Sequence, residues 1–376
     1  MSYDFDIVIA GASYAGLTAA RHLGGTGARV LIVDEHAIGA LRHSACGVPT
    51  RTLAAVGGMA SACQETGWGV VHTKFNRVRF PWPEPWTVFD HQALCLALRA
   101  QAPDVSFLQA RVTAFDGAAL VTSKGTFTAR QFVDATGWRA VLASALHPAY
   151  VDRGRLTVGI EVSVPGCTDA LHFYADKEIV RRGYGWVFPY GDERRVGLVA
   201  FDNAKGMADR LRAFLARLGI TSDPRDVTRN GGILPWHARP AAVGDLWVLG
   251  DAAGHCLPLT GEGIRFALQD GETAGRLLRM ALNETIAWEA ARTAYATAAA
   301  GHRARVGAYT QFQALACALP NVAYAPMVWA LGRRSARALI LRRYMAWEHP
   351  APMVQVNESC PALHRTTSAH DRIMPI

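Results

Sequence analysis

Cysteines are few in this sequence and form no recognisable pattern. There are seven in 376 residues, an odd number, and no two stand as Cys-x-x-Cys. A disulfide framework or a zinc site needs paired or regularly spaced cysteines, so we expect neither and predict no metal ligands. Reduced thiols are typical of cytoplasmic proteins.

Long apolar runs are also missing. No uninterrupted run reaches the ~18 residues that a membrane-spanning helix needs. The nearest candidate, 312–331, is broken by Gln313, Pro320, Asn321 and Pro326. The N-terminus lacks the charged and apolar segments of a secretory signal. We therefore expect a cytoplasmic protein that touches a membrane only at its surface, if at all.

Acidic residues are absent from a long C-terminal stretch, 290–347, which carries eight arginines and matches the net charge of +8. Such a stretch either contacts an anionic membrane or phosphorylated ligand, or forms solvated helices packed on the rest of the protein. Lysine is rare, and no zinc finger, RNA-binding signature or lysine-rich tail is present, so we expect no nucleic-acid partner. The arginines are Arg292, Arg303, Arg305, Arg333, Arg334, Arg337, Arg342 and Arg343.

The N-terminus contains a dinucleotide-binding pattern. A buried strand at 6–10 (DIVIA) precedes the turn GASYAG at 11–16, a helix to residue 23 and a second strand at 29–33. Gly11 permits the tight turn, Gly16 lets the helix approach the strand, and the helix start offers N–H groups to a pyrophosphate. Asp34 can accept from ribose hydroxyls and disfavours a 2′-phosphate. Candidate cofactor contacts here are Gly11, Ser13, Tyr14, Ala15, Gly16, Asp34 and Glu35.

Two distant segments complete this pattern. A strand at 131–134 ends in the turn Ala-Thr-Gly137, and a strand at 246–249 leads into GDAAG and then PLTGEGI, which opens a long helix. Asp251 can accept from a ribityl or ribose hydroxyl, and backbone N–H groups near Glu262 can stabilise negative charge on a reduced flavin. These segments add Gly137, Asp251, Gly261, Gly263 and Ile264 to the candidate cofactor contacts.

With these motifs, the Cys46-Gly47 loop and the block Gly183-Tyr-Gly-Trp-Val-Phe-Pro189, the sequence resembles the geranylgeranyl reductase family. That family lies within the flavoproteins that include para-hydroxybenzoate hydroxylase. The resemblance implies non-covalent FAD, reduction of isoprenoid carbon–carbon double bonds, and NAD(P)H or another donor that visits transiently. It also implies an α/β fold: a glutathione-reductase-type (Rossmann-like) FAD-binding domain, an interleaved antiparallel-sheet substrate domain and a C-terminal helical region.

The same motifs divide the chain. The FAD-binding domain is expected at 1–75, 95–150 and 240–285, and the substrate-binding sheet at 76–94 and 151–239. A helical region is expected at 286–348, followed by a tail of loop or disorder at 349–376, which has four prolines and little periodicity.

Three aromatic residues are the candidate substrate contacts. Tyr184, Trp186 and Phe188 alternate along one strand and should share a face, which either lines a cavity for an apolar substrate or packs against a helix. By the resemblance, Cys46 corresponds to a loop cysteine beside the flavin. It is our candidate catalytic residue, tuning the flavin or relaying a proton, and the turn residues around it favour exposure; the alternative is an inert buried thiol.

One position departs from the family pattern: His91 stands where members often have an arginine, which weakens an expected pyrophosphate contact. The favoured function is an FAD-dependent reductase of isoprenoids or other polyenes. The alternatives are an FAD-dependent monooxygenase, hydroxylase or halogenase-like, acting on an aromatic small molecule, and a non-redox flavoprotein. A halogenase would use Lys74 as its catalytic lysine. No second glycine fingerprint marks an NAD(P)H site, and no motif indicates an oligomeric state.

Overall fold

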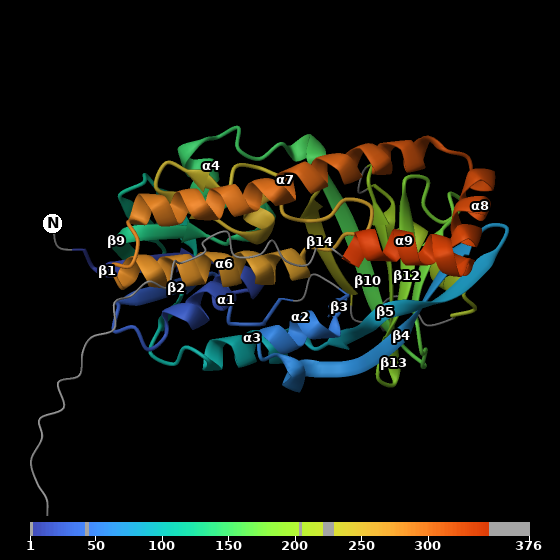
Figure 1. The fold of residues 1–376 in the computed structure, drawn as a ribbon, viewed down its shortest axis with the longest axis horizontal. Helices are drawn as coiled ribbons and strands as arrows, with labels where there is room; N and C mark the ends of the chain where they lie inside the picture. The colour runs from blue at the N-terminus through green and yellow to red at the C-terminus, as the bar shows by residue number, and fades with distance from the viewer. Residues whose placement is uncertain (1–2, 42–44, 203–204, 221–228, 346–376) are drawn as a thin grey trace, which may run out of the picture.

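The computed structural model describes residues 3–41, 45–202, 205–220 and 229–345. Within these ranges the chain forms two eight-stranded sheets that occupy opposite halves of an elongated molecule (Figure 1). Helix α7 (Trp288–Ala318) runs along one edge and spans both halves.

The first sheet has the strand order β15-β16-β9-β1-β2-β6 and is parallel except at β15. Its central strand is buried on both faces, because Ile7, Val8 and Ile9 are each fully covered, as the apolar run predicts. A hairpin of β7 and β8 extends it through β9. The strands are β1 (Phe5–Ala10), β2 (Val30–Asp34), β6 (Ser106–Gln109), β7 (Val112–Phe115), β8 (Ala119–Thr122), β9 (Gly125–Asp134), β15 (Ala242–Val243) and β16 (Leu246–Val248).

Helices α1 (Tyr14–Leu23) and α6 (Ile264–Leu282) pack on this sheet in unusually close contact. A Cβ atom on Gly271 would lie 2.5 Å from the Ala15 carbonyl oxygen, and one on Gly275 would lie 2.7 Å from that of Ala19. Residue numbers rise in the same direction along both helices, since Gly271 faces Ala15 and Gly275 faces Ala19. The helices therefore run parallel and begin at the same edge of the sheet. The shorter helices nearby are α2 (Thr50–Ala55), α3 (His91–Ala100) and α4 (Val141–Leu146).

The second sheet has the order β14-β10-β13-β12-β11-β4-β5-β3. Every pair is antiparallel except β11 with β4, so the expected antiparallel sheet is interrupted once. Helix α5 (Met207–Arg217) covers one face. The strands are β3 (Gly47–Pro49), β4 (Ala62–Thr73), β5 (Arg77–Phe89), β10 (Leu156–Pro165), β11 (Leu171–Ala175), β12 (Gly183–Tyr190), β13 (Glu193–Ala200) and β14 (Arg229–Pro235).

The boundary expected at residue 75 needs correction. Strands β3 and β4 belong to the second sheet rather than to the FAD-binding unit, because β4 pairs with β5 along most of its length and with β11 at its end. Conversely, α3 begins at His91 and packs on α1, although 91–94 were expected in the substrate sheet. The hairpin with β5 and the pairing with the distant strand β11 together decide where β4 belongs.

Among the described residues, which end at 345, three helices follow α6 in the expected helical region 286–348: α7, α8 (Asn321–Gly332) and α9 (Arg334–Met345). Pro320 stands immediately before α8 and Pro326 lies inside it. Helices α8 and α9 contact β5, and α8 also contacts β4. The tail expected at 349–376 lies outside the described residues. Across the part of the chain that the structure describes, no helix combines the length and apolarity needed to cross a membrane.

Candidate functional site

The glycine turn after β1 is closely packed against the turn after β9. Gly11 has a φ of 108°, and a Cβ atom there would lie 2.1 Å from the Ala135 carbonyl oxygen. A Cβ on Gly16 would lie 2.0 Å from the Gly11 carbonyl oxygen. Both positions therefore exclude any side chain, which is the role that the sequence pattern predicts for them.

The start of α1 is open to an anion. Ser13 is the exposed N-cap residue, and its side chain makes no capping hydrogen bond to the first turn of the helix, which begins at Tyr14 and Ala15. Asp34 lies at the end of β2, where one carboxylate oxygen accepts from the Ala12 N–H at 2.7 Å. Glu35, beside it, is exposed. This geometry suits the pyrophosphate and ribose of a dinucleotide.

A second open helix start lies at α6. Its N-cap residue, Gly263, has no side-chain capping bond, and a Cβ atom there would lie 2.9 Å from an Asp251 carboxylate oxygen. Gly261 adopts a φ of 68°, which favours glycine, and Ile264 is buried as the first helical residue. The loop backbone thus approaches Asp251 closely, as expected for a flavin-binding turn.

Arg239 joins the turn after β9 to the turn after β16. Its guanidinium donates to the carbonyl oxygens of Trp138, at 3.1 Å, and Ala252, at 3.2 Å. It thereby holds the turn at Gly137 against the 3₁₀ turn Gly250–Ala253. Gly137 has a φ of 70°, and a Cβ there would meet no atom within 4 Å, so the surface beside it is open. Sequence analysis missed Arg239, because nothing local distinguishes it from other arginines.

Asp251 has a partly buried carboxylate that could accept a hydrogen bond from a cofactor hydroxyl. No hydrogen-bond donor of the described residues contacts its carboxylate. Burial raises its pKa to about 6, although the charges of Arg239 and His255 act in the opposite direction. A ribityl or ribose hydroxyl would supply the missing hydrogen bond. The starts of α1 and α6 and the Asp251 carboxylate lie at one edge of the first sheet. Together they offer N–H donors and a hydroxyl acceptor that fit FAD.

Three hydrogen bonds join the second sheet to this edge. The Tyr184 hydroxyl donates to the Thr260 carbonyl oxygen in the PLTGEGI loop. Arg195 donates to the Ala45 carbonyl oxygen at 2.8 Å, and the Tyr190 hydroxyl donates to the Asp90 carboxylate at 2.9 Å. The second sheet is thus bonded to the PLTGEGI loop, to the residue before Cys46 and to the start of α3.

The predicted aromatic residues share one face of that sheet. Tyr184, Trp186 and Phe188 are half-buried, whereas Val187, which points to the other face, is buried in the core beneath α5. The Trp186 ring lies across Gly197, where a Cβ atom would be 2.1 Å from the ring, and its indole N–H donates to Glu161 at 3.0 Å. The aromatic face is therefore not the core of the α5 layer.

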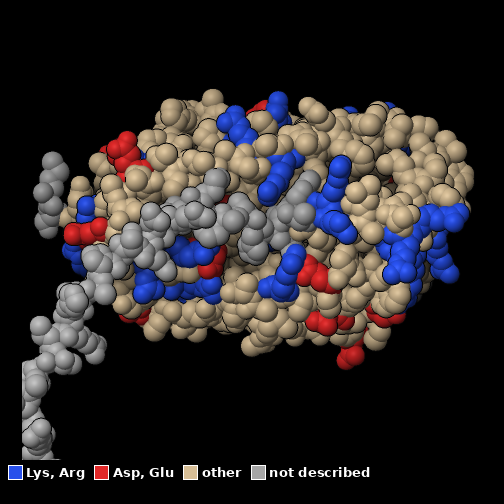
Figure 2. Space-filling view, in the orientation of Figure 1, with Lys and Arg blue, Asp and Glu red and all other residues tan. Residues whose placement is uncertain are grey.

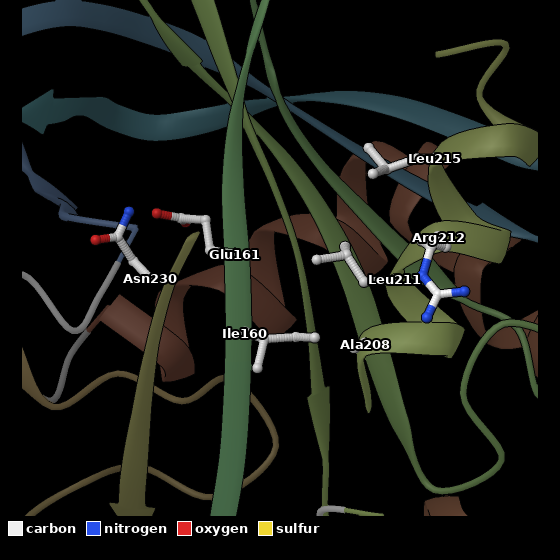
Figure 3. A pocket seen from close by; sticks show the side chains of 7 residues that line it. All are labelled: Ile160, Glu161, Ala208, Leu211, Arg212, Leu215 and Asn230. Atoms are coloured by element: carbon white, nitrogen blue, oxygen red, sulfur yellow. The ribbon is translucent and has the colours of Figure 1, made fainter. Parts of the chain in front are cut away.

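A small cavity of about 130 Å³ lies against α5 instead (Figure 3). Figure 3 shows Leu211 and Leu215 of α5 on one side of β10, and Glu161 and Asn230 on the other. Most of its lining comes from α5, and Glu161, which accepts from Trp186, lines it as well. It is also smaller than the ~300 Å³ at which ligand pockets begin.

Cys46 lies beside Tyr14 and is fully buried, so the expected exposure is wrong. The Tyr14 hydroxyl is 3.7 Å from the Cys46 sulfur and 2.7 Å from Nδ1 of His91. Burial raises the pKa of Tyr14 well above its ordinary value, so Tyr14 stays a neutral phenol. His91, which stands where an arginine contact to the pyrophosphate would be expected, is buried and hydrogen-bonded to Tyr14.

A buried carboxylate, Asp270, supports the GDAAG turn from below. It accepts from the Gly250 N–H at 2.7 Å and lies 2.6 Å from Nδ1 of His255, with His302 beyond. His255 is therefore a buried partner of Asp270 on the interior side of the GDAAG turn. An acidic residue on the buried side of α6, in register with Phe266, was a signal that sequence analysis did not use. No cluster able to hold a metal ion occurs within the described ranges.

The fold and site define an FAD-dependent oxidoreductase, and comparisons with known proteins agree. No family model matches. A menaquinone reductase from Mycolicibacterium smegmatis is 28% identical over 320 residues, 73% of this chain and 76% of that protein. A digeranylgeranylglycerophospholipid reductase from Methanocaldococcus jannaschii is 32% identical over 118 residues, which span only 30% of either chain.

Solved structures share the fold. A geranylgeranyl bacteriochlorophyll reductase-like protein from Thermoplasma acidophilum superposes with a TM-score of 0.78 at 15% identity, over 92% of this chain and 99% of that one. A flavin-dependent brominase superposes with a TM-score of 0.71 at 14% identity, over 90% of this chain and 92% of that one. The chain is thus similar in sequence to these reductases and shares the fold of FAD-dependent oxidoreductases.

Replacing Asp251 by Asn should weaken FAD binding while stabilising the flavin-free protein. Because the folded-state pKa is raised to about 6, the ionised carboxylate destabilises the fold at pH 8, by up to about 3 kcal/mol, and Asn removes that cost. The gain should shrink as pH falls through 6 and vanish near pH 4, where both folded and unfolded states are protonated. Urea unfolding at several pH values and FAD titration measure both effects; unchanged FAD affinity would contradict the assignment.

Proposed function

We propose that the protein reduces carbon–carbon double bonds of an isoprenoid or other polyene. The observation that carries this proposal is the half-buried aromatic face of β12, tied by Tyr184 to the loop at Thr260 that bears the flavin motif. An apolar wall beside a flavin suits a long unsaturated hydrocarbon. The menaquinone and digeranylgeranylglycerophospholipid reductases named above act on isoprenoid compounds, which supports the same substrate class.

The chain's own residues would bind, orient and protect the reacting groups. FAD, when bound, supplies the hydride. Gly11, Ser13 and Gly16 would receive the pyrophosphate, and Asp251 the ribityl chain. Trp186, held against Gly197 and by Glu161, is rigid enough to orient a substrate and keep water from the reacting carbons.

The buried cluster of Tyr14, Cys46 and His91 can also hold or transfer the proton that alkene reduction requires. Tyr14 contacts both Cys46 and His91, so a proton held at the Tyr14 hydroxyl can pass to either neighbour. We propose Cys46 as the member of this cluster that acts on the flavin or relays the proton. Its left-handed backbone, with a φ of 57°, is strained for a cysteine and fits a functional position.

The second candidate is an FAD-dependent monooxygenase acting on an aromatic compound, supported by the fold shared with the brominase. The halogenase version of it is disfavoured by the place of Lys74. That lysine lies in the exposed turn between β4 and β5, ion-paired with Glu178. The neighbouring Asn76 bonds to Ala325 of α8, so this turn lies against the C-terminal helices rather than at the flavin motifs.

We also propose a transient NAD(P)H donor and a cytoplasmic location at a membrane surface. Seven of the thirteen exposed large apolar side chains of the described residues lie between 312 and 340. Val322, Trp329 and Leu339 are 63%, 53% and 59% exposed. Figure 2 shows basic side chains gathered over α9. Exposed apolar residues beside arginines favour an anionic bilayer, from which an isoprenoid substrate can enter.

Oxygen-free turnover tests the proposed function. Protein reduced by dithionite should saturate double bonds of a polyprenyl substrate without oxygen, because alkene reduction needs only hydride and a proton. Mass spectrometry would show a gain of two mass units per bond. Product formed only with oxygen, from an aromatic substrate, would establish the monooxygenase. NADH and NADPH, tried separately, identify the donor by bleaching of the flavin.

Replacing Trp186 by Ala should lower kcat/KM at least about tenfold, because the substrate loses an aromatic wall, while FAD affinity changes less than about twofold. Val187→Ala is the matched control on the same strand. It opens a cavity under α5 and should lower the free energy of unfolding by about 1–3 kcal/mol with kcat/KM nearly unchanged. Equal loss of turnover and flavin binding in the Trp186 variant would favour a purely structural role.

Replacing Trp329 and Leu339 together by Ser should reduce flotation of the protein with phosphatidylglycerol vesicles at low salt, because apolar burial in the bilayer is lost. Leu96→Ser, an equally exposed site on α3, controls for general surface polarity. Equal flotation of all three proteins, or none for the unmodified protein, would refute the membrane contact.

A further inference from the structure

Arg195 is a fully buried arginine on the same face of the second sheet as the aromatic residues. It stands opposite Phe188 in the pairing of β13 with β12, and residues paired in this way share a face. Its Nη1 donates to the Ala45 carbonyl oxygen at 2.8 Å, and its guanidinium carbon lies 3.6 Å from the centre of the Tyr190 ring. The guanidinium is thus held beside the residue that precedes Cys46.

The buried charge of Arg195 needs an anion nearby, because burial removes the hydration that water would supply. Its Nε and Nη2 atoms have no hydrogen-bond partner among the described residues. The Tyr190 hydroxyl donates to Asp90, and burial raises the pKa of Tyr190, so this ring is neutral. Glu161 already accepts from the Trp186 indole. The side chain of Cys46 is therefore the other group that can balance the guanidinium.

The electrostatics of Arg195 agree with that pairing. Burial acts to lower the pKa of Arg195, but negative charge on Cys46, and after it on Glu161, outweighs burial and raises the pKa. The effect is reciprocal, because a guanidinium that is stabilised by a thiolate stabilises that thiolate to the same extent.

A second cysteine in the same cluster shows the effect of burial. Cys95 of α3 is fully buried, with its sulfur 3.9 Å from Nδ1 of His91. Burial raises the pKa of Cys95 to about 12, and the charge of Cys46 acts in the same direction. Cys95 therefore stays a thiol. Because Arg195 interacts with Cys46, the two buried cysteines are expected to ionise at different pH.

We propose that Arg195 stabilises the thiolate form of Cys46 and thereby enables Cys46 to donate the proton of alkene reduction. The S–H bond breaks, its electron pair stays on sulfur beside the guanidinium, and the proton bonds to one alkene carbon while the other carbon receives the hydride. The Tyr14 hydroxyl, 3.7 Å from the sulfur, returns a proton to Cys46 and regains one from His91, 2.7 Å away.

Arg195 acts through Cys46 and is therefore a positioning residue. This inference rests on the proposed function, and it adds the group that makes the proton donor effective. Other titratable groups face the cluster, and they are unchanged in the Arg195 variants below, so a change in Cys46 ionisation reports on Arg195. These groups are Tyr14, His91, Cys95, Asp90, Tyr190 and Glu161.

Three single variants isolate the guanidinium. Arg195→Gln removes its charge, and Arg195→Lys keeps it. Arg194→Gln is the matched control, because it removes one positive charge from the adjacent residue of β13, which faces the other side of the sheet and bonds to the Pro165 carbonyl oxygen. Circular dichroism and FAD titration check that each variant is folded and loaded.

Ionisation of Cys46 can be measured without substrate or turnover. The Cβ chemical shift of carbon-13-labelled cysteine follows the thiol in the flavin-loaded, oxidised protein, and the signal of Cys46 is identified by its loss in Cys46→Ala. At pH 7 the thiolate fraction of Cys46 should be about tenfold or more lower in Arg195→Gln. It should stay within about twofold of the unmodified protein in Arg195→Lys and Arg194→Gln.

Turnover of a polyprenyl substrate under the oxygen-free conditions described above completes the test. Arg195→Gln should lower kcat at pH 7 by about tenfold or more with KM within about twofold, because the proton donor is impaired and the aromatic wall is intact. Arg195→Lys should restore most of the rate, since a merely structural role of the side chain would not follow its charge.

Equal thiolate fractions in Arg195→Gln and the unmodified protein would overturn the inference, as would an equal change in Arg194→Gln. The unmodified protein provides a test that needs no variant: a Cys46 that remains a thiol up to about pH 9, above the ordinary range of free cysteine, would also overturn it. The expected change in ionisation without alkene reduction by any of the proteins would refute the proposed function and leave the ion pair intact, so the two failures are distinguishable.

Discussion

The close contact of α1 with α6 is the constraint on which the rest of the structure depends. Gly271 and Gly275 let the two helix backbones meet where any side chain would collide with a carbonyl oxygen. The helices run parallel, so their uncapped starts open at the same edge of the first sheet. Two positive dipole ends are thereby brought within reach of one dinucleotide, and Asp251 lies at the second of them.

The two faces of the second sheet differ in burial: one is covered by α5, and the other carries half-buried aromatic residues. Alternation along β12 sends Val187 into the core under α5 and leaves Trp186 and Phe188 half-buried on the other side. Hydrogen bonds from Tyr184 and Arg195 then fix this second face against the flavin loops. An apolar wall is thus held by polar contacts at its margins.

The C-terminal helices carry an excess of positive charge. Some of their arginines line a groove beside β5, and others lie on the exposed surface. Helical periodicity turns Arg334, Leu341 and Met345 toward β5, whereas Arg343 and Leu339 face outward. Arg334, Arg337 and Arg342 thus line this open groove beside β5, whereas Arg343 lies on the exposed surface. Composition reveals the charge, but only the helix faces reveal which arginines serve which environment.

The sequence by itself determined the turns and the acid that we expect to hold the nucleotide, because each of them is local: a glycine turn between a strand and a helix, or an acid at a strand end. The alternation that places Tyr184, Trp186 and Phe188 on one face is local too. Tertiary structure alone decided that β4 joins the second sheet, that Cys46 is buried beside Tyr14 and His91, and that Arg239 and Arg195 bridge the loops. The contacts of Cys46, Arg239 and Arg195 join residues between 32 and 150 positions apart, and the free energy of such contacts leaves no mark on the neighbouring sequence.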